Sequence, residues 1–123
     1  MKVWSKAWKG SKKPRKQRKY VKKAPAHLCG RFLNSHLSLE LRKKLKHRSL
    51  RVRKGDKVKV LRGSFKGKTG TVDRIDVRRQ KVYVTGVESV KKDGSKALYP
   101  LHPSNLMIRD LEGSERRRVG EAK

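Results

Sequence analysis

The chain has 123 residues, which suits one small domain with extensions rather than two full domains. It carries 37 Lys and Arg against 10 Asp and Glu, so its net charge is +27 and it repels itself until counter-charge arrives. Membranes and acidic proteins seldom select so extreme a balance, whereas a polyphosphate releases condensed counterions when Lys and Arg neutralise it. We therefore expect a nucleic-acid-binding protein.

Cysteine content and hydropathy predict an intracellular protein. Cys29 is the single cysteine, so neither an internal disulfide nor a paired-cysteine zinc site can form. The basic residues 1–13 are followed by no apolar run, so we expect no signal peptide, and nothing approaches the length of a membrane span. The expected location is the cytoplasm, with no membrane partner.

The positive charge is concentrated toward the start of the chain. Residues 1–54 hold 20 basic residues and one acid, whereas residues 55–123 hold 17 basic and 9 acidic residues. Residues 1–36 contain no acid, and their stretch 11–23 has Pro14 and almost nothing to bury, so it cannot offset its ordering entropy. We predict a basic RNA-binding extension over residues 1–36 that is disordered when free.

Three aromatic residues, Trp4, Trp8 and Tyr20, are interleaved with the lysines of this extension. Their rings could stack on unpaired bases, or they could cover apolar patches on the folded part of the chain. The sequence favours neither alternative. A solubilising tail or a nuclear-localisation signal would have a similar basic composition.

A short amphipathic helix is predicted next, within residues 37–50. Ser38 is a good N-cap, and Leu37, Leu41 and Leu45 recur every four residues to form one apolar face. A helix of about nine residues is marginal alone, so its leucine face needs a partner. We expect that partner to be the module that follows.

From residue 51 the hydrophobic pattern changes to a period of two, which indicates short strands separated by turns. Several such strands suggest a small, strongly bent barrel over residues 51–112, followed by a C-terminal tail, residues 113–123. The predicted strands are residues 57–60, 71–77, 82–85, 97–99 and 106–108. The predicted inward side chains are Val58, Val60, Phe65, Val72, Ile75, Val82, Val84, Val87, Leu98, Leu106 and Ile108.

The glycine-lysine segment RGSFKGKTGT resembles a P-loop, which would make the chain a nucleotide hydrolase. The spacing from Gly63 to Gly67 is one residue too short, however, and strand-forming residues follow where a P-loop needs a helix. The alternative is a hairpin loop in which these glycines and Gly70 supply positive φ or close backbone approach. Lys66, Lys68 and exposed backbone N–H groups would then reach phosphates. The sequence leaves a second alternative, a plain hairpin whose glycines serve the turn geometry alone.

No group of residues predicts catalysis. Asp73 and Asp76 lie among arginines on a predicted strand and are expected to be solvated charge-balancing groups. The four histidines have no metal-ligand spacing, and we expect Ser104 to have neither a nearby base nor the glycine elbow of a nucleophile. We expect no enzymatic activity, no metal, no cofactor and no small-molecule substrate.

Residues 53–86 resemble a KOW motif. In this motif an entering strand is followed by a glycine-lysine loop and then by hydrophobic strands, the last of which ends in glycine. The flanking segments are APAHL at 24–28, LSLELR at 37–42, RSLRVRKGD at 48–56 and HPSNLMI at 102–108. Together these segments resemble the universal large-subunit ribosomal protein twenty-four family, in its archaeal and eukaryotic form, over about residues 20–112. The transcription-linked KOW proteins are the alternative, but they normally add a mixed α/β domain for which 123 residues leave no room.

The resemblance implies a mainly β fold, a small SH3-like barrel carrying the KOW motif, with a basic N-terminal extension that contains one short helix. It implies a structural constituent of the large ribosomal subunit that binds the 5′ region of large-subunit ribosomal RNA early in assembly. The implied place is near the mouth of the peptide exit tunnel, beside neighbouring large-subunit ribosomal proteins. The chain departs from the family pattern at Cys29 and Gly30, which precede Arg31 where an arginine usually follows His-Leu directly, and at Thr85, where the family usually has Glu.

The resemblance and the charge pattern together predict which residues contact ribosomal RNA. They lie in the extension, around residues 48–53 and in the glycine-lysine loop. The predicted contacts are Lys12, Lys13, Arg15, Lys16, Arg18, Lys19, Lys22, Lys23, His27, Arg31, Arg48, Arg51, Arg53, Arg62, Gly63, Lys66, Gly67, Lys68 and Gly70.

Overall fold

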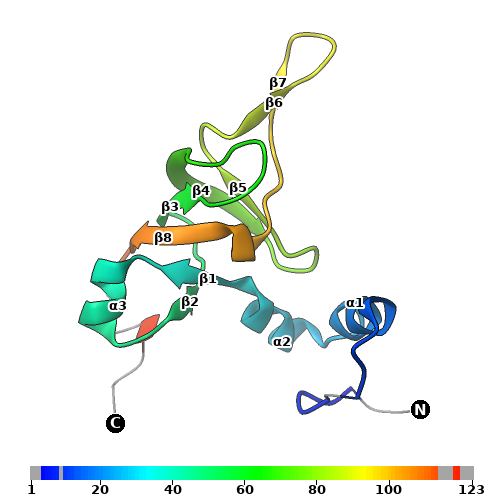
Figure 1. The fold of residues 1–123 in the computed structure, drawn as a ribbon. Coiled ribbons are helices and arrows are strands. Elements are labelled where there is room, and N and C mark those ends of the chain that lie inside the picture. Colours follow the sequence, from blue (N-terminus) through cyan, green and yellow to red (C-terminus); the bar gives the residue numbers. More distant parts are fainter. Residues whose placement is uncertain (1–3, 9, 114–117, 120–123) are drawn as a thin grey trace.

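A computed structural model describes residues 4–8, 10–113 and 118–119 of the chain, and it combines a six-stranded sheet, a two-stranded hairpin and short helices (Figure 1). The helices are α1 Pro14–Lys22, α2 Ala26–Cys29 and α3 Leu39–Leu45, with 3-10 turns η1 Gly30–Leu33 and η2 Pro103–Asn105. The strands are β1 Asn34–Leu37, β2 Ser49–Arg51, β3 Lys57–Val60, β4 Thr69–Asp76, β5 Lys81–Val84, β6 Glu88–Val90, β7 Lys96–Leu98 and β8 Leu106–Asp110. None of the helices in the described residues is long and apolar enough to cross a bilayer.

The large sheet has the order β2-β1-β8-β3-β4-β5, in which β1 and β8 run parallel and the other neighbours run antiparallel. Strand β4 is shared: residues 69–71 pair with β3, and the strand then pairs with β5 from Val72 onward. The register shifts between Val72 and Arg74. Such a bulge bends a strand, so β4 carries the sheet around a corner.

The expected mainly β barrel with one short helix is wrong in two respects. The fold is mixed α/β, with three α-helices in the described residues, and the six strands do not close into a barrel. The sheet ends at β2 and β5, and β5 meets the returning chain only at the Val82–Leu101 bridge. Strands β6 and β7 pair with each other instead of extending the sheet, and Val90 is 70% exposed, so little apolar contact draws this hairpin onto the core.

Strand β1 and the first two residues of β2 were expected to lie outside the β module. His36 and Leu37 pair with β8, and Leu37 enters the main core. Ser35 is buried beside it, and its hydroxyl donates a hydrogen bond to the carbonyl of Pro103 at 2.5 Å. Long-range pairing, rather than local apolar alternation, therefore makes β1 a strand.

The core confirms most of the predicted inward residues. Phe65 and Ile75 pack against it while partly buried, whereas Leu98 lies on the separate hairpin. Leu37, Val52 and Leu101 complete it. The confirmed buried residues are Val58, Val60, Val72, Val82, Val84, Val87, Leu106 and Ile108.

The predicted helix within residues 37–50 is confirmed as α3, but its expected apolar face is wrong at Leu37, which lies in β1 because it pairs with β8. The Ser38 hydroxyl accepts a hydrogen bond from the backbone N–H of Leu41, as an N-cap should. Leu41 and Leu45 pack against the core, which supplies the partner that so short a helix needs.

Helix α1 was not predicted, although Pro14 is compatible with the start of a helix. Pro14 occupies the first helical position, where its missing N–H costs nothing and its fixed φ suits the helix. The nine residues of α1 include five Lys or Arg and no acid, and none of them is buried. Like charges three and four residues apart destabilise a helix, so α1 contributes little stability by itself.

Disorder of the free extension stays a prediction, and amide hydrogen exchange measures it. Without a polyanion, we expect the amides of α1 to exchange much faster than those of β3 and β8. Inorganic polyphosphate should slow exchange in α1, because it screens repulsion among the five cations. Protection of α1 equal to that of β8 in the free chain would contradict the prediction.

A buried ion pair fastens the C-terminal segment to the sheet. The Asp56 side chain is completely buried, and the guanidinium of Arg118 donates to both of its oxygens, with Nη2–Oδ2 at 2.8 Å. The backbone N–H groups of Arg53 and Glu112 also donate to this carboxylate, at 2.9 and 3.0 Å. Arg118 donates further to the carbonyl of Arg51 at 2.6 Å, so one side chain joins three segments.

Replacing Arg118 with alanine should lower the free energy of unfolding by about 3 kcal/mol, because it leaves the buried Asp56 carboxylate without its counter-charge. Urea denaturation measures the change. Arg79→Ala is the matched control, since its pair with Asp76 is exposed and should cost about 0–1 kcal/mol. An equal decrease in the free energy of unfolding in the two variants would show that the buried pair stabilises the fold no more than the exposed one.

Candidate nucleic-acid interface

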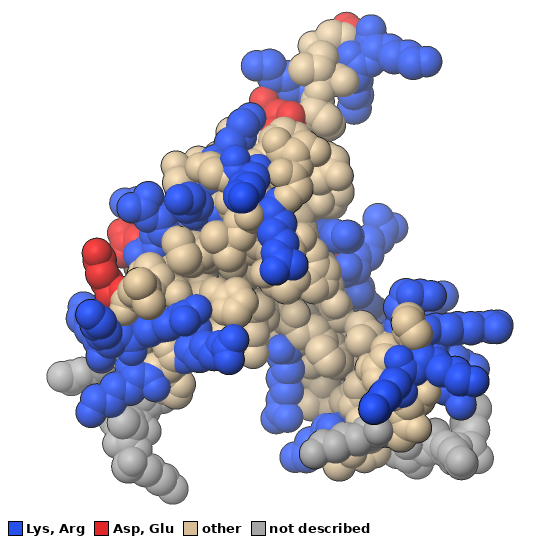
Figure 2. Space-filling model, in the orientation of Figure 1, with Lys and Arg blue, Asp and Glu red and all other residues tan. Residues whose placement is uncertain are grey.

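Several acidic groups of the described residues are engaged with nearby cations. Asp56 pairs with Arg118, and Lys57 Nζ lies 3.4 Å from a carboxylate oxygen of Asp110. Among the charged side chains on the face shown in Figure 2, Lys and Arg predominate over the sheet, the extension and the projecting hairpin, and few acids lie between them. A surface of this kind attracts a polyanion from several directions.

The glycine-lysine loop between β3 and β4 has the geometry that the sequence predicted. Gly63 and Gly67 have φ of 91° and 87°, which L side chains rarely adopt. Gly70 serves the other purpose: a Cβ there would collide with the Thr85 carbonyl, so its absence lets β4 approach β5. All three glycines therefore shape the hairpin.

Phe65 anchors the loop to the body of the protein. Its ring packs against the core and lies 5.0 Å from the ring of Tyr99, while the Lys68 ammonium lies 5.1 Å from the Phe65 centroid. Backbone hydrogen bonds from Gly67 to Val60 and from Val60 to Lys68, both 2.8 Å, close the base of the loop. The loop is thus a fixed projection that exposes its lysines.

The loop cannot act as a P-loop. Strand β4 begins at Thr69, directly after it, so no helix N-terminus is available to receive phosphates. Among the described residues, moreover, no three His, Cys, Asp or Glu side chains gather in a way that could hold a metal ion.

A second cationic surface lies where the extension joins the sheet. The Arg51 guanidinium passes over Gly30, and a Cβ at that glycine would lie 2.5 Å from Arg51 Nη1. Gly30 therefore makes room for this guanidinium. The arrangement brings Arg51 of β2 beside the α2–η1 segment that carries His27 and Arg31.

The predicted contacts do not form one site. The extension projects from one end of the sheet, while the glycine-lysine loop lies toward the end that carries the β6–β7 hairpin (Figure 1). All the predicted Lys, Arg and His contacts are nevertheless exposed, on both surfaces. They are Lys12, Lys13, Arg15, Lys16, Arg18, Lys19, Lys22, Lys23, His27, Arg31, Arg48, Arg51, Arg53, Arg62, Lys66 and Lys68.

The three aromatic residues of the extension take a role that the sequence analysis did not consider. Trp4 and Trp8 each stack on Tyr20 of α1, with ring centroids 4.8 and 4.9 Å apart. The cluster folds the start of the chain back onto α1 rather than covering the sheet.

A third cationic group, on the β6–β7 hairpin, was missed. Lys91, Lys92 and Lys96 are exposed around its turn. The hydrogen bond from the Ser95 hydroxyl, 2.6 Å, and a further one from the Ser95 N–H lower the pKa of Asp93 and fix the turn. The sequence does contain a signal for this group, because Asp93-Gly94 is typical of a hairpin turn and lysines flank it on both sides.

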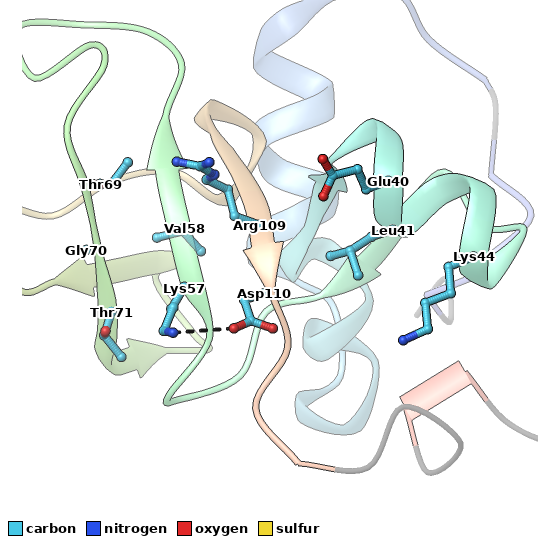
Figure 3. Close-up of a pocket in the computed structure, with 10 residues that line it drawn as sticks. All are labelled: Glu40, Leu41, Lys44, Lys57, Val58, Thr69, Gly70, Thr71, Arg109 and Asp110. Carbon is cyan, nitrogen blue, oxygen red and sulfur yellow. Dashed lines mark ion pairs between the residues drawn. The ribbon is translucent and has the colours of Figure 1, made fainter.

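A groove between α3 and the sheet, lined by residues of β3, β4 and β8, is chemically mixed rather than cationic (Figure 3). Glu40 lines one side, and the Lys57–Asp110 ion pair lies on the other. Because carboxylates of two elements border it, this groove is the least suited of the described surfaces to phosphate.

Ser104 does have a base within reach, contrary to the sequence analysis. Its hydroxyl lies 2.8 Å from Nδ1 of His102, and its backbone N–H donates to the same nitrogen at 3.3 Å. Burial, and then the nearby charge of Lys81, lower the pKa of His102, which favours the neutral ring that accepts these bonds. The pair caps η2, and no carboxylate bonded to His102 completes a triad within the described residues.

A family model that describes the ribosomal protein L26 of eukaryotes and its archaeal counterpart matches residues 11–120. The chain belongs to this family. As a member of the L26 family it is a structural, non-enzymatic component of the large ribosomal subunit, which confirms the predicted family, the absence of catalysis and the ribosomal location. The transcription-linked and nucleotide-hydrolase alternatives are set aside.

Changing Lys66 and Lys68 together to alanine should weaken RNA binding without unfolding this L26-family chain, since both ammonium groups project from a loop held by backbone bonds. Filter binding to large-subunit RNA and urea denaturation measure the two effects. Lys57→Ala is a control, because its ammonium is already engaged with Asp110. Unchanged RNA affinity in the double variant would remove the loop from the interface.

Proposed function

We propose that this chain binds large-subunit ribosomal RNA, in its 5′ region, early in subunit assembly and near the mouth of the peptide exit tunnel. The RNA region, the timing and the place are implied by the family resemblance. RNA binding itself is supported by one observation above all: every predicted cationic contact is exposed, while several acids are occupied within the protein.

The glycine-lysine loop would supply a rigid contact. Its backbone is fixed by the Val60–Gly67 and Val60–Lys68 hydrogen bonds and by Phe65, so little conformational entropy is lost when phosphates meet Lys66. Gly63 and Gly67 have positive φ, and nothing lies within 4 Å of the position that a Cβ would take at either residue, so the loop backbone is open to close approach by RNA.

The extension would supply an adaptable contact. Helix α1 buries none of its residues, so RNA can reach it from many directions. Because the extension and the loop lie at different parts of the molecule (Figure 1), they would neutralise separate RNA segments. Holding two such segments together against phosphate repulsion is the structural task we assign to the protein.

The side of the molecule that carries α3 would contact neighbouring large-subunit proteins. The mixed-charge groove beside α3, with Leu39 72% exposed on the same helix, is less suited to RNA than the rest of the surface. We assign protein contacts to this side.

RNA affinity should fall steeply as salt rises, because each neutralised phosphate releases counterions. The slope of log K against log salt concentration should be about −0.7 per phosphate contact in single-stranded regions. Titrations of large-subunit RNA at several potassium chloride concentrations measure it. A flat response would contradict the electrostatic basis of the proposal.

Sedimentation of cell extracts tests the assignment in the cell. The tagged chain should follow large ribosomal particles, including early precursors, through a high-salt gradient. Cofractionation with RNA polymerase instead would overturn the proposed role.

A further inference from the structure

A hollow on the extension differs in chemistry from the other cationic surfaces, because aromatic rings and ammonium groups line it together. Lys16, Lys19, Tyr20 and Lys23 follow the helical spacing i, i+3, i+4 and i+7, so they share one face of α1 and its C-cap. Trp4 and Trp8 pack onto this face from the start of the chain.

The two tryptophans differ in how their polar atoms are used. Trp4 Nε1 donates to the Tyr20 carbonyl at 3.0 Å, and the Tyr20 hydroxyl donates to the Ser5 carbonyl at 2.8 Å. Trp4 thus satisfies a carbonyl in the last turn of α1, which helix geometry leaves unpaired. This tryptophan holds the segment in place.

Trp8 stacks on the same tyrosine, but its indole N–H has no acceptor among the described residues. Gly10 keeps that edge of the ring open: a Cβ at residue 10 would lie 3.0 Å from Trp8 Nε1. Trp8 is only partly buried. A large ring, whose N–H finds no acceptor in the part of the chain that the structure describes, therefore borders a hollow rimmed by three lysines.

We propose that this hollow binds one unstacked nucleotide of RNA, with the base against the Trp8 indole and its phosphate among Lys16, Lys19 and Lys23. Stacking of a base on an aromatic ring tolerates any sequence, and the ammonium groups supply the counter-charge. Bases inside a duplex are not accessible in this way, so the occupant is a nucleotide from a loop or bulge. The inference rests on the proposed RNA binding and gives the extension a contact with bases.

Intrinsic fluorescence tests the proposal directly, because Trp4 and Trp8 are the only tryptophans of the full chain. Comparison of the full chain with a Trp8→Leu variant, in which Trp4 is the sole tryptophan, isolates the tryptophan emission of Trp8 and keeps the Trp4 anchor. A short single-stranded oligoadenylate should quench the Trp8 emission, whereas inorganic polyphosphate of equal charge should bind without quenching, since it has no bases.

Trp8→Leu should weaken oligoadenylate binding about 5- to 150-fold, the range for loss of one stacked base, and leave polyphosphate affinity unchanged. Trp8→Phe keeps a ring and should retain part of the affinity. Far-UV circular dichroism checks that the variants keep their helices.

Three results would overturn the nucleotide site: equal quenching by both polyanions, unchanged oligoadenylate affinity in Trp8→Leu, or an equal loss of affinity for both polyanions. The last would assign Trp8 to holding the segment on α1. In each case large-subunit RNA could still bind elsewhere on the chain. Absence of any binding to that RNA would instead defeat the proposed function.

Discussion

Electrostatic self-repulsion is the constraint on which the rest of this structure depends. A net charge of +27 on 123 residues opposes compaction, so the fold must hold against it. The buried valines and leucines of the bent sheet provide non-directional cohesion, and the Asp56–Arg118 pair joins β2, the start of β3 and the C-terminal segment. The extension has no acid with which to balance its charge, and it projects away from the sheet (Figure 1). The proposed RNA phosphates would supply the negative charge that the extension lacks.

The parts of the fold that local signals specify could be predicted from the sequence. Alternation located β3, β5 and most of β4, the Ser38 cap located α3, and the glycines located the loop. Strand β1 could not be found in this way, since Asn-Ser-His-Leu has one apolar residue and becomes a strand only by pairing with β8. Closure of the sheet likewise depends on pairing between distant segments, which local alternation of apolar residues does not predict. The predicted barrel is therefore wrong.

The candidate interface divides along the same line. Exposed lysines and arginines follow from charge alone, and their exposure matched expectation. The contacts that hold this surface in place could not be predicted, because they join residues that are distant in the sequence. Arg118 lies 62 residues from Asp56, and Trp4 lies 16 residues from Tyr20. Gly30 is an example: the need for a glycine at this position is explained only by the Arg51 guanidinium that packs over it, 21 residues further along the chain.

Hydroxyl-radical footprinting of large-subunit ribosomal RNA tests the central claim most directly. The claim is that two separate cationic surfaces hold two RNA segments together. The full chain should protect two groups of nucleotides in the 5′ region, and a chain lacking residues 1–23 should lose one group and keep the other. Protection of the same nucleotides by both chains, or of none, would contradict the account.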